Sequence, residues 1–404
     1  MVTGMGVLSP LGLDLASSLT AIKNQESAIR YISAWDEYKT LKTRLGAPLP
    51  DLSLPIHFDK KRTRSMGRGA LISTLSAEMA LIDSGLIDQS EIVQGGRLGI
   101  AFGSGTGGVD ALADMTRFIT EKTTRGMSGT TYHRMMSHTC ASNIGIFFGI
   151  TGRVIVTSSA CTSGSLAIGY GFEAIRDGHQ DLMLCGGAEE FSASIAAIFD
   201  VLFACSVKNN EPRNNPRPFD KDRDGLVVGE AASTLVLEEY EHAKKRGANI
   251  LAEIVGFGTN SDGYHITTPR LETVQKAMEL ALSSAGLSPD KIAYINAHAT
   301  GTMVGDVVES NATYNIFSSA TPISSLKGIM SHTLGGSGST EAALTIGMMR
   351  EGWIAENYNL DVADENCAKL DYVKNECRDF AGEYAMTNTF AFGGINTSII
   401  VKKI

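Results

Sequence analysis

The order of apolar and polar stretches along the chain predicts short strands that alternate with helices. Apolar runs such as 154–157 and 292–296 predict buried strands, and each is followed by small residues and a new helical stretch. Strands that alternate with helices are typical of proteins whose sheet is covered by helices. The pattern therefore predicts an α/β fold.

Comparison of the chain with itself indicates an internal duplication. Three pairs of segments recur in the same order: a strand that enters a glycine turn (3–6 and 255–258), a helix that ends at glycine (79–86 and 279–287), and a helix bounded by glycines (164–178 and 338–352). One pair alone would be an ordinary coincidence, but three in order favour a repeated unit. We expect two α/β halves in a layered αβαβα arrangement.

The duplication divides the chain into an N-terminal half, residues 1–245, and a C-terminal half, residues 246–404. The first half is longer because of two additional segments, 27–68 and 120–154, which are candidates for a cap, a dimer contact or a substrate tunnel. The polar and proline-rich stretch 208–225 predicts a long surface loop.

The composition excludes several classes of protein. The 404 residues carry a formal net charge of -9, and no cluster of basic residues would neutralise a row of phosphates, so we expect no nucleic acid partner. No apolar stretch is long enough to span a membrane, and six scattered cysteines fit a reducing compartment. We expect a cytoplasmic protein that begins within a strand, with a few residues upstream.

Cys161 is the candidate nucleophile. It follows the strand 154–157 and the small residues Ser158, Ser159 and Ala160, and it precedes a helix. The N–H groups at the start of a helix carry partial positive charge, which favours the thiolate form of a nearby cysteine. The other five cysteines lack this setting and are interpreted as ordinary buried residues.

Two histidines lie at similar junctions. His298 follows the strand 292–296, and His332 precedes the glycine-rich run 335–338 that enters a helix. The carboxyl ends of strands in an α/β protein converge on one crevice, so we expect both histidines to meet Cys161 there.

Five motifs occur in a fixed order around these residues. They are Ala160-Cys161-Thr162-Ser163-Gly164; Arg217-Pro218-Phe219-Asp220 with Arg223-Asp224-Gly225; His298-Ala299-Thr300-Gly301-Thr302 with Asp306 and Glu309; Lys327 with His332, Gly335 and Gly338; and Asn388 to Asn396. Together they resemble the elongating β-ketoacyl-acyl carrier protein synthases of the thiolase-like superfamily. The resemblance covers almost the whole chain, and it implies the thiolase-like fold.

The resemblance implies a decarboxylative condensation that needs no cofactor or metal. Cys161 would accept an acyl group from an acyl carrier protein, and malonyl-carrier protein would supply the two-carbon unit. The enolate formed by decarboxylation would accept hydrogen bonds from His298 and His332, and it would then attack the Cys161 thioester.

Further residues take supporting roles by the same resemblance. The backbone N–H groups of Cys161 and Phe392 would form an oxyanion hole, and Phe392 would gate the acyl pocket. Lys327 would support His332, paired with Glu309. Asp306, Phe390 and Gly393 would hold this arrangement in place.

The chain departs from the family pattern at four positions and at the predicted end of the acyl pocket. Ala299, Ser331 and Ala391 replace glycines, and Gly328 replaces a serine. Thr106 places a hydroxyl where an apolar residue is common, which hints at an unusual acyl chain. The segments 35–48 and 56–67 are similar to synthases of aryl polyene pathways.

Other readings of the sequence are weaker. Gly103, Gly105 and Gly108 satisfy a dinucleotide-binding pattern, but the same position in the second half carries the His298 loop. The acidic run 220–225 resembles half of a calcium loop with its twelfth ligand misplaced, and His133 with His138 makes a weak zinc pair. A thiolase, and a non-catalytic paralogue that shapes the tunnel of a synthase, remain as alternatives. The partner would be a second copy or a chain-length-factor-like paralogue.

Overall fold

One large sheet runs through the protein, and its two halves repeat the same order of strands. The computed structural model describes residues 1–404. The sheet has the order β13-β11-β10-β15-β16-β9-β1-β8-β6-β4-β5. Its strands are β1 (Val2–Leu8), β4 (Leu98–Ser104), β5 (Val154–Val156), β6 (Leu182–Glu189), β8 (Ala231–Glu238), β9 (Ala252–Ser261), β10 (Ile292–Asn296), β11 (Pro322–Ser324), β13 (Asp371–Tyr372), β15 (Tyr384–Ala391) and β16 (Ile395–Lys403).

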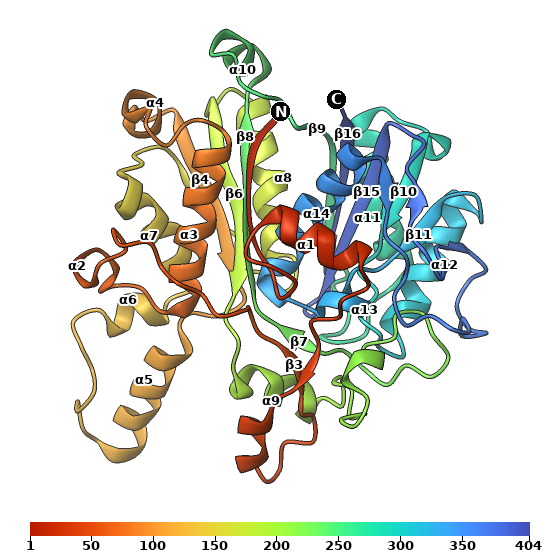
Figure 1. The fold of residues 1–404 in the computed structure, drawn as a ribbon, viewed down its shortest axis with the longest axis horizontal. Helices are drawn as coiled ribbons and strands as arrows, with labels where there is room; N and C mark the ends of the chain where they lie inside the picture. Colours follow the sequence, from red (N-terminus) through yellow and green to blue (C-terminus); the bar gives the residue numbers. More distant parts are fainter.

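The predicted duplication is confirmed by this order. The run β1-β8-β6-β4-β5 corresponds strand for strand to β9-β16-β15-β10-β11. In each run the second strand is antiparallel to its neighbours and the remaining strands are parallel. The two runs meet through Val2 and Ala252 near the starts of β1 and β9, and they then spread apart (Figure 1).

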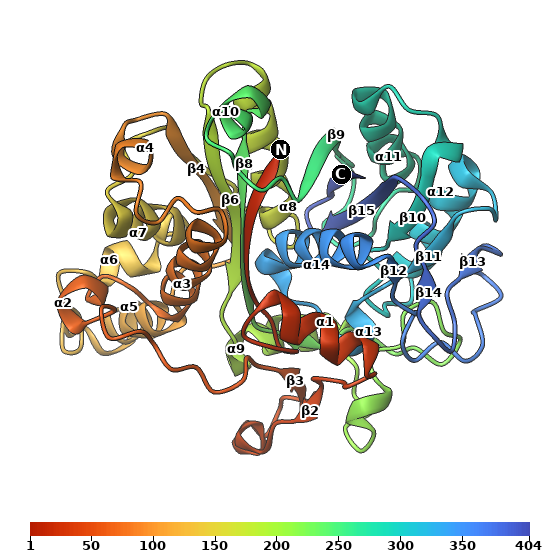
Figure 2. The ribbon, with the colours of Figure 1, turned by 45° about the horizontal axis from the view of Figure 1, so that its top comes forward.

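Helices fill the space between the two halves and cover their outer faces. They are α1 (Leu15–Lys23), α2 (Lys60–Thr63), α3 (Arg68–Asp83), α4 (Ser90–Gln94), α5 (Val109–Glu121), α6 (Thr131–Met135), α7 (Thr139–Phe148), α8 (Ser163–Arg176), α9 (Ala193–Val201), α10 (Tyr240–Lys245), α11 (Leu271–Ala285), α12 (Gly305–Phe317), α13 (Lys327–Met330) and α14 (Ser337–Glu351). The pair α8 and α14 lies between the halves, α3 and α7 cover the first, and α11 and α12 cover the second (Figures 1 and 2). This is the predicted layered αβαβα arrangement.

The first repeated segment proved to be the interior of a strand, so the predicted glycine turn is wrong. Gly4 and Gly6 lie within β1, where a Cβ atom would come 2.5 Å and 2.0 Å from carbonyl oxygens of α3. Gly256 and Gly258 stand in the same relation to α11. The glycines therefore let each outer helix approach its strand closely.

The third repeated segment brings the starts of α8 and α14 into direct backbone contact. A Cβ atom on Gly164 would lie 2.7 Å from the backbone nitrogen of Ser339, and one on Gly338 would lie 2.6 Å from that of Ser165. Real Cβ atoms do not approach backbone so closely, because the repulsion is too large. The reciprocal glycines therefore fix how the two central helices cross.

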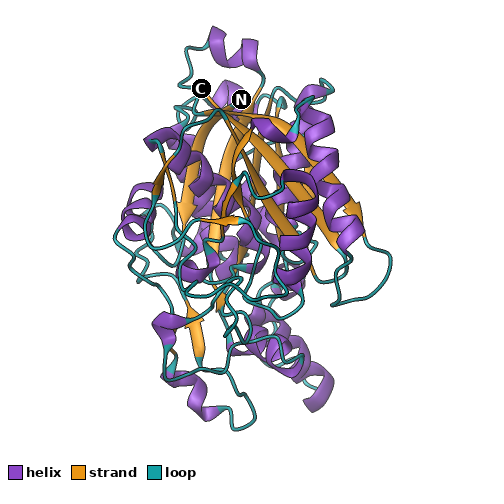
Figure 3. Cartoon of the chain, turned by 90° about the vertical axis from the view of Figure 1, so that its right-hand side faces the viewer, coloured by secondary structure: helices purple, strands orange, loops and turns teal.

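The first additional segment lies at the end of the sheet where the parallel strands finish, whereas the second, 120–154, contains α6 and the covering helix α7. Segment 27–68 contains β2 (Arg30–Tyr31), β3 (Leu45–Ala47) and α2, and β3 pairs with β7 (Val228–Gly229) in a small separate sheet. A further two-stranded sheet joins β12 (Trp353–Ile354) to β14 (Arg378–Asp379). Long loops gather at this end, opposite the two termini (Figure 3).

The stretch 208–225 is a surface loop only in its first part. Arg223 is buried, and its guanidinium donates to the Asp364 carboxylate at 2.6 Å and to the carbonyls of Thr302 and Met303 at 3.0 and 2.8 Å. Phe219 is buried as well, and its backbone N–H donates to Asp306. The loop thus connects the two halves, because buried polar groups require partners that only the other half supplies.

None of the helices combines the length and the apolar character needed to span a membrane.

We expect Gly338→Ala to lower the free energy of unfolding by about 1 to 3 kcal/mol, the usual cost of overpacking. The added methyl group has backbone as its neighbour, which cannot turn aside as a side chain can. Urea denaturation would measure the change.

A matched control is Gly145→Ala in α7, where the new methyl group would make an ordinary contact of 3.4 Å with Ile100. That variant should be as stable as the natural chain or more so, since alanine favours a helix. Equal stabilities for the two variants would contradict the close crossing of α8 and α14.

Candidate active site

Cys161 lies where β5 leads into α8, as predicted. The preceding residue, Ala160, has a φ of 52°, a left-handed conformation that is uncommon outside glycine. This turn presents the Cys161 sulfur toward the second half of the protein, where its Sγ lies 3.0 Å from Nε2 of His332. A strained backbone conformation costs free energy and persists only where the surrounding structure holds it in place. Such conformations are common at functional residues.

The two histidines meet the cysteine from the carboxyl ends of β10 and β11. His298 follows β10, and His332 follows β11 and the short helix α13. Their rings lie 5.1 Å apart, edge to face. The convergence of Cys161, His298 and His332 in one place is therefore as the sequence predicted.

The thiol is not activated in the way that its position near a helix suggested. Burial raises the pKa of the Cys161 thiol to about 12, and the charge of Lys327 and the N–H groups of Cys161 and Phe392 offset this only in part. The first residue of α8 is Ser163, so Cys161 precedes the helix. The residue as a whole is only 5% exposed. The loss of hydration outweighs the helix dipole here, and the resting cysteine is a neutral thiol.

Both histidines are neutral for the same reason. Burial lowers the pKa of His298 and of His332 well below the usual value, and the positive charge of Lys327 lowers both further. Neither Nδ1 atom has a hydrogen-bond partner. A neutral imidazole carries one N–H and one lone pair, so each ring can donate one hydrogen bond into the cavity without carrying charge.

Lys327 is buried beside the histidines, but its partner is not the predicted one. Its Nζ is paired with the carboxylate of Glu341 in α14. Glu309 instead accepts the backbone N–H groups of His298 and Ala299 at 2.9 and 2.7 Å. Glu309 therefore shapes the turn that carries His298, and Glu341 holds the lysine.

Asp306 has a similar structural task. Its carboxylate accepts the N–H groups of Phe219 and Gly301, and it lies 4.0 Å from Arg223. Burial raises the pKa of Asp306 to about 6 and that of Glu309 to about 7. Both acids therefore fix backbone around the cavity.

The turn that follows β15 carries Phe392 and closes over the sulfur. The N–H group of Phe392 hydrogen bonds to the Cys161 thiol and lowers its pKa, as does the N–H group of Cys161. The Phe392 ring lies 5.8 Å from that of Phe199. Gly393 is exposed with a φ of 93°, and its N–H donates to the carbonyl of Ile266. Two N–H groups thus lie close to the sulfur, where they could reach the carbonyl oxygen of a thioester formed on it.

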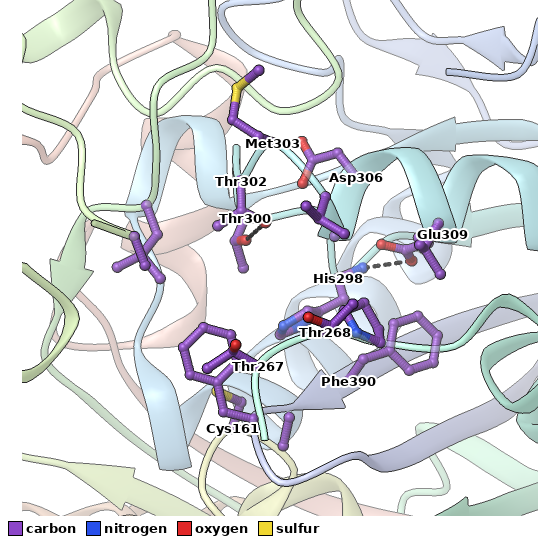
Figure 4. Close-up of a pocket in the computed structure, with 18 of the residues that line it drawn as sticks. Cys161, Thr267, Thr268, His298, Thr300, Thr302, Met303, Asp306, Glu309 and Phe390 are labelled. Atoms are coloured by element: carbon purple, nitrogen blue, oxygen red, sulfur yellow. Dashed lines mark hydrogen bonds between the residues drawn. The ribbon is translucent and has the colours of Figure 1, made fainter. Parts of the chain in front are cut away.

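A cavity of about 250 Å³ leads from the surface to these residues. Its lining includes Cys161, His298 and Phe390 together with four hydroxyl-bearing residues, Thr267, Thr268, Thr300 and Thr302 (Figure 4). The Phe390 ring lies edge-on to His298 at 6.0 Å. The structure therefore places a mixed polar and apolar channel in front of the sulfur.

Thr106 does not line this cavity. Its hydroxyl donates to the carboxylate of Glu189 at 3.2 Å, and Glu189 also accepts the N–H groups of Gly105 and Gly335. Burial raises the pKa of Glu189 to about 7. Glu189 joins the loop after β4 to the segment after His332. No motif in the sequence indicated Glu189, because its partners lie in two regions, 105–106 and 335, that are both far from it along the chain.

The four departures from the family pattern are accommodated in different ways. Ser331 has a φ of 75°, and its buried hydroxyl has no partner, so this residue is strained beside His332. Gly328 could not be serine here, because a Cβ atom would lie 2.4 Å from the carbonyl of Tyr358. Ala299 and Ala391 are buried without positive φ. Only Ser331 therefore carries a backbone cost.

The weaker readings of the sequence are resolved by local contacts. A Cβ atom on Gly103 would lie 2.5 Å from the carbonyl oxygen of Thr157, and one on Gly105 would lie 2.3 Å from the carboxylate of Glu189, so these two glycines of the dinucleotide-binding pattern serve close packing. The Asp220 carboxylate accepts a hydrogen bond from Arg217 at 3.0 Å, whereas the Asp224 carboxylate accepts one from the backbone N–H of Val207, so the acidic loop does not converge on a calcium site.

The donor atoms of Cys161, His298 and His332 lie within 4.8 Å of one another, which is the spacing that a soft divalent ion could bridge.

Comparison with known families and proteins gives one consistent result. The profile of the Beta-ketoacyl synthase, N-terminal domain, matches residues 1–243, and that of the Beta-ketoacyl synthase, C-terminal domain, matches residues 251–361. The chain is 37% identical over 412 residues to 3-oxoacyl-[acyl-carrier-protein] synthase 2 of Vibrio cholerae, with 100% of this chain and 99% of that protein covered.

Solved structures give the same picture. A Beta-ketoacyl synthase from Burkholderia phymatum STM815 superposes with a TM-score of 0.98 at 49% identity, covering 100% of this chain and 98% of that one. A ketosynthase in complex with its chain length factor, from Xenorhabdus doucetiae, superposes with a TM-score of 0.85 at 26% identity, covering 100% and 97%.

The raised thiol pKa predicts how Cys161 reacts with iodoacetamide. The thiolate is the reactive form, so the alkylation rate at Cys161 should rise about tenfold for each pH unit between pH 7 and 9, without a plateau. Mass spectrometry of the modified peptide would measure the rate, and Cys161→Ala would give the background from the partly exposed Cys377. A plateau below pH 8 would show a resting thiolate paired with an imidazolium.

Proposed function

This chain belongs to the β-ketoacyl synthase family, and we propose that Cys161, His298 and His332 divide the steps of its reaction between them. The enzyme is a 3-oxoacyl-[acyl-carrier-protein] synthase that condenses an acyl group with a malonyl unit held on acyl carrier protein. The observation that carries the proposal is the meeting of the Cys161 sulfur, 3.0 Å from His332, with two imidazoles and the Phe392 N–H group in one cavity.

The first step transfers the acyl group to Cys161. Its sulfur attacks the carbonyl carbon of the acyl thioester, and the carrier sulfur leaves with the proton that the thiol loses. The negative oxygen that forms in between accepts hydrogen bonds from the N–H groups of Cys161 and Phe392. The neutral resting thiol means that this proton is lost only when a thioester is bound, so the buried sulfur does not remain charged.

The second step removes carbon dioxide from malonyl-carrier protein. The bond between the carboxylate and the methylene carbon breaks, and its electron pair passes into the thioester carbonyl to give an enolate. Nε2–H groups of His298 and His332 donate hydrogen bonds to that enolate oxygen. Burial lowers the pKa of both rings, and the charge of Lys327 lowers it further, so both rings stay neutral while they donate these hydrogen bonds.

The third step forms the new carbon–carbon bond. The enolate carbon attacks the carbonyl carbon of acyl-Cys161, the oxyanion again lies against the two N–H groups, and the sulfur leaves and takes up a proton. The products are carbon dioxide and a β-ketoacyl group on the carrier. Each step uses an interaction that grows with the charge in its transition state, which is how such a site accelerates a reaction.

The alternatives fit the site less well. A paralogue that only shapes the tunnel of a synthase needs no nucleophile, whereas here Cys161 lies beside the backbone N–H group of Phe392 and two histidines. A thiolase would use a second cysteine as its base, and the five other cysteines do not line the cavity. The decarboxylating reaction therefore remains the one that these side chains support.

The partner of the enzyme is acyl carrier protein, and we further propose a second subunit that is either another copy or a chain-length-factor-like paralogue. The edge strand β5 supports this, since it is paired on one side only, with β4, and its Val154 and Val156 are exposed. The six cysteines are unpaired, which supports a place in the cytoplasm. The pathway would be that of fatty acids, polyketides or aryl polyenes.

The division of labour predicts that Cys161→Gln keeps the second step and loses the first and third. Glutamine cannot form a thioester, but its amide resembles one in shape, and the two histidines are unchanged. Release of carbon dioxide from malonyl-carrier protein should therefore persist while no β-ketoacyl product forms. A variant with both Cys161→Gln and His298→Ala is the control, and it should lose the release. Loss of decarboxylation in Cys161→Gln alone would contradict the roles given to the histidines.

A further inference from the structure

The side chains of Cys161, His298 and His332 together form a set of metal-binding atoms. A cysteine sulfur and imidazole nitrogens are ligands that zinc prefers, whereas magnesium and calcium prefer oxygen. One such atom from each of the three residues lies within 4.8 Å of the other two. All three residues are buried, so the packed structure already holds these atoms together before any metal binds.

The spacing of the three atoms is close to that of a zinc site. Zinc bonds of about 2.3 Å to sulfur and about 2.0 Å to nitrogen place a tetrahedral sulfur about 3.5 Å from each nitrogen and the two nitrogens about 3.3 Å apart. The Cys161 sulfur lies 3.0 Å from Nε2 of His332, and no two atoms of the set are more than 4.8 Å apart. Shifts of about 1 Å complete the geometry, and rotation of the imidazole rings supplies them, because that torsion is soft.

The proton of each imidazole is free to lie on either nitrogen. A histidine that binds a metal uses the lone pair of one nitrogen and carries its proton on the other, and a hydrogen bond at the second nitrogen usually fixes this arrangement. The Nδ1 atoms of His298 and His332 have no hydrogen-bond partner. Each ring can therefore present an N–H group to an enolate in one tautomer and a lone pair to a metal in the other.

The cavity in front of these side chains suits the entry of a cation. Its carboxylate-bearing lining residues are Asp224, Asp262, Asp306 and Glu309, and neither lysine nor arginine lines it. The nearby Lys327 is not a lining residue, and its Nζ is paired with the carboxylate of Glu341. The cavity volume of about 250 Å³ leaves room for water at a fourth coordination position (Figure 4).

We propose that Cys161, His298 and His332 form a binding site for Zn²⁺, and that zinc reversibly inhibits the enzyme there. A zinc–sulfur bond replaces the S–H bond of Cys161, the thiol proton passes to solvent, and each imidazole keeps its proton on the nitrogen that does not bind the metal. This inference rests on the proposed function, because inhibition follows only if the same sulfur accepts the acyl group. Zinc and the acyl group then exclude each other.

The test measures how far Zn²⁺ protects Cys161 from iodoacetamide, which does not depend on catalysis. The natural chain and its variants are alkylated over a titration of Zn²⁺, and mass spectrometry of the Cys161 peptide gives the rate. His298→Asn and His332→Asn each remove one metal ligand. His138→Ala is the matched control, because it breaks the pair of rings that His138 forms with His133 outside the cavity. Urea denaturation shows whether each variant folds.

Zn²⁺ should slow alkylation of the natural chain about tenfold once its concentration exceeds the Kd by the same factor, and EDTA should restore the rate. Each histidine variant should need at least about tenfold more zinc for the same protection, since loss of even an outer-shell partner typically lowers metal affinity by about 10- to 100-fold. His138→Ala should match the natural chain. Zinc should also raise the urea midpoint of the natural chain but not that of Cys161→Ala.

Equal alkylation rates with and without Zn²⁺, or an unchanged urea midpoint, would overturn the proposal. Unchanged protection in both histidine variants would show that the sulfur binds metal without the imidazoles, and loss of protection in His138→Ala would place the metal at the outer pair. Either result contradicts the three-ligand site. Failure of acyl-carrier protein to acylate Cys161 in metal-free buffer would instead contradict the proposed function, whatever the effect of zinc on alkylation.

Discussion

The close crossing of α8 and α14 is the constraint on which the site depends. Gly164 and Gly338 let the first turns of the two helices touch through backbone atoms. Cys161 stands just before one helix and His332 just before the other, so the contact between the helices sets the distance between sulfur and imidazole. Because the crossing is reciprocal, the duplicated fold brings one chemical group from each half to the same point. A catalytic pair thus follows from the packing of two similar units.

Burial then decides the charge of what meets there. The loss of hydration leaves Cys161 as a thiol and both histidines uncharged, while Lys327 is paired with Glu341. A site of neutral donors suits a reaction in which negative charge appears only briefly, on a tetrahedral oxygen and on an enolate. Fixed hydrogen-bond donors stabilise that charge in the transition state more than they stabilise the uncharged thioester.

Much of this was predictable from the sequence, and the failures share a cause. The duplication and the junction positions of Cys161, His298 and His332 follow from periodic patterns and local motifs. The Lys327 partner, the thiol pKa and the burial of Arg223 do not, because each depends on groups that come together only in the folded chain. Glu309 and Glu341 are both acids in the same part of the sequence as Lys327. Only the folded position of α14 shows that Glu341 is the partner of this lysine. Local sequence patterns therefore predict where in the fold a side chain lies, whereas its pKa and its hydrogen-bond partners depend on tertiary packing.

The central claim is that Cys161 carries the acyl group, and intact-mass analysis after incubation with acyl-carrier protein tests it most directly. The account predicts a mass increase equal to one acyl group, located on the peptide that contains Cys161. That increase should disappear on addition of malonyl-carrier protein, because condensation releases the sulfur, and it should be absent from Cys161→Ala. An acyl group found on another residue, or on no residue, would contradict the account.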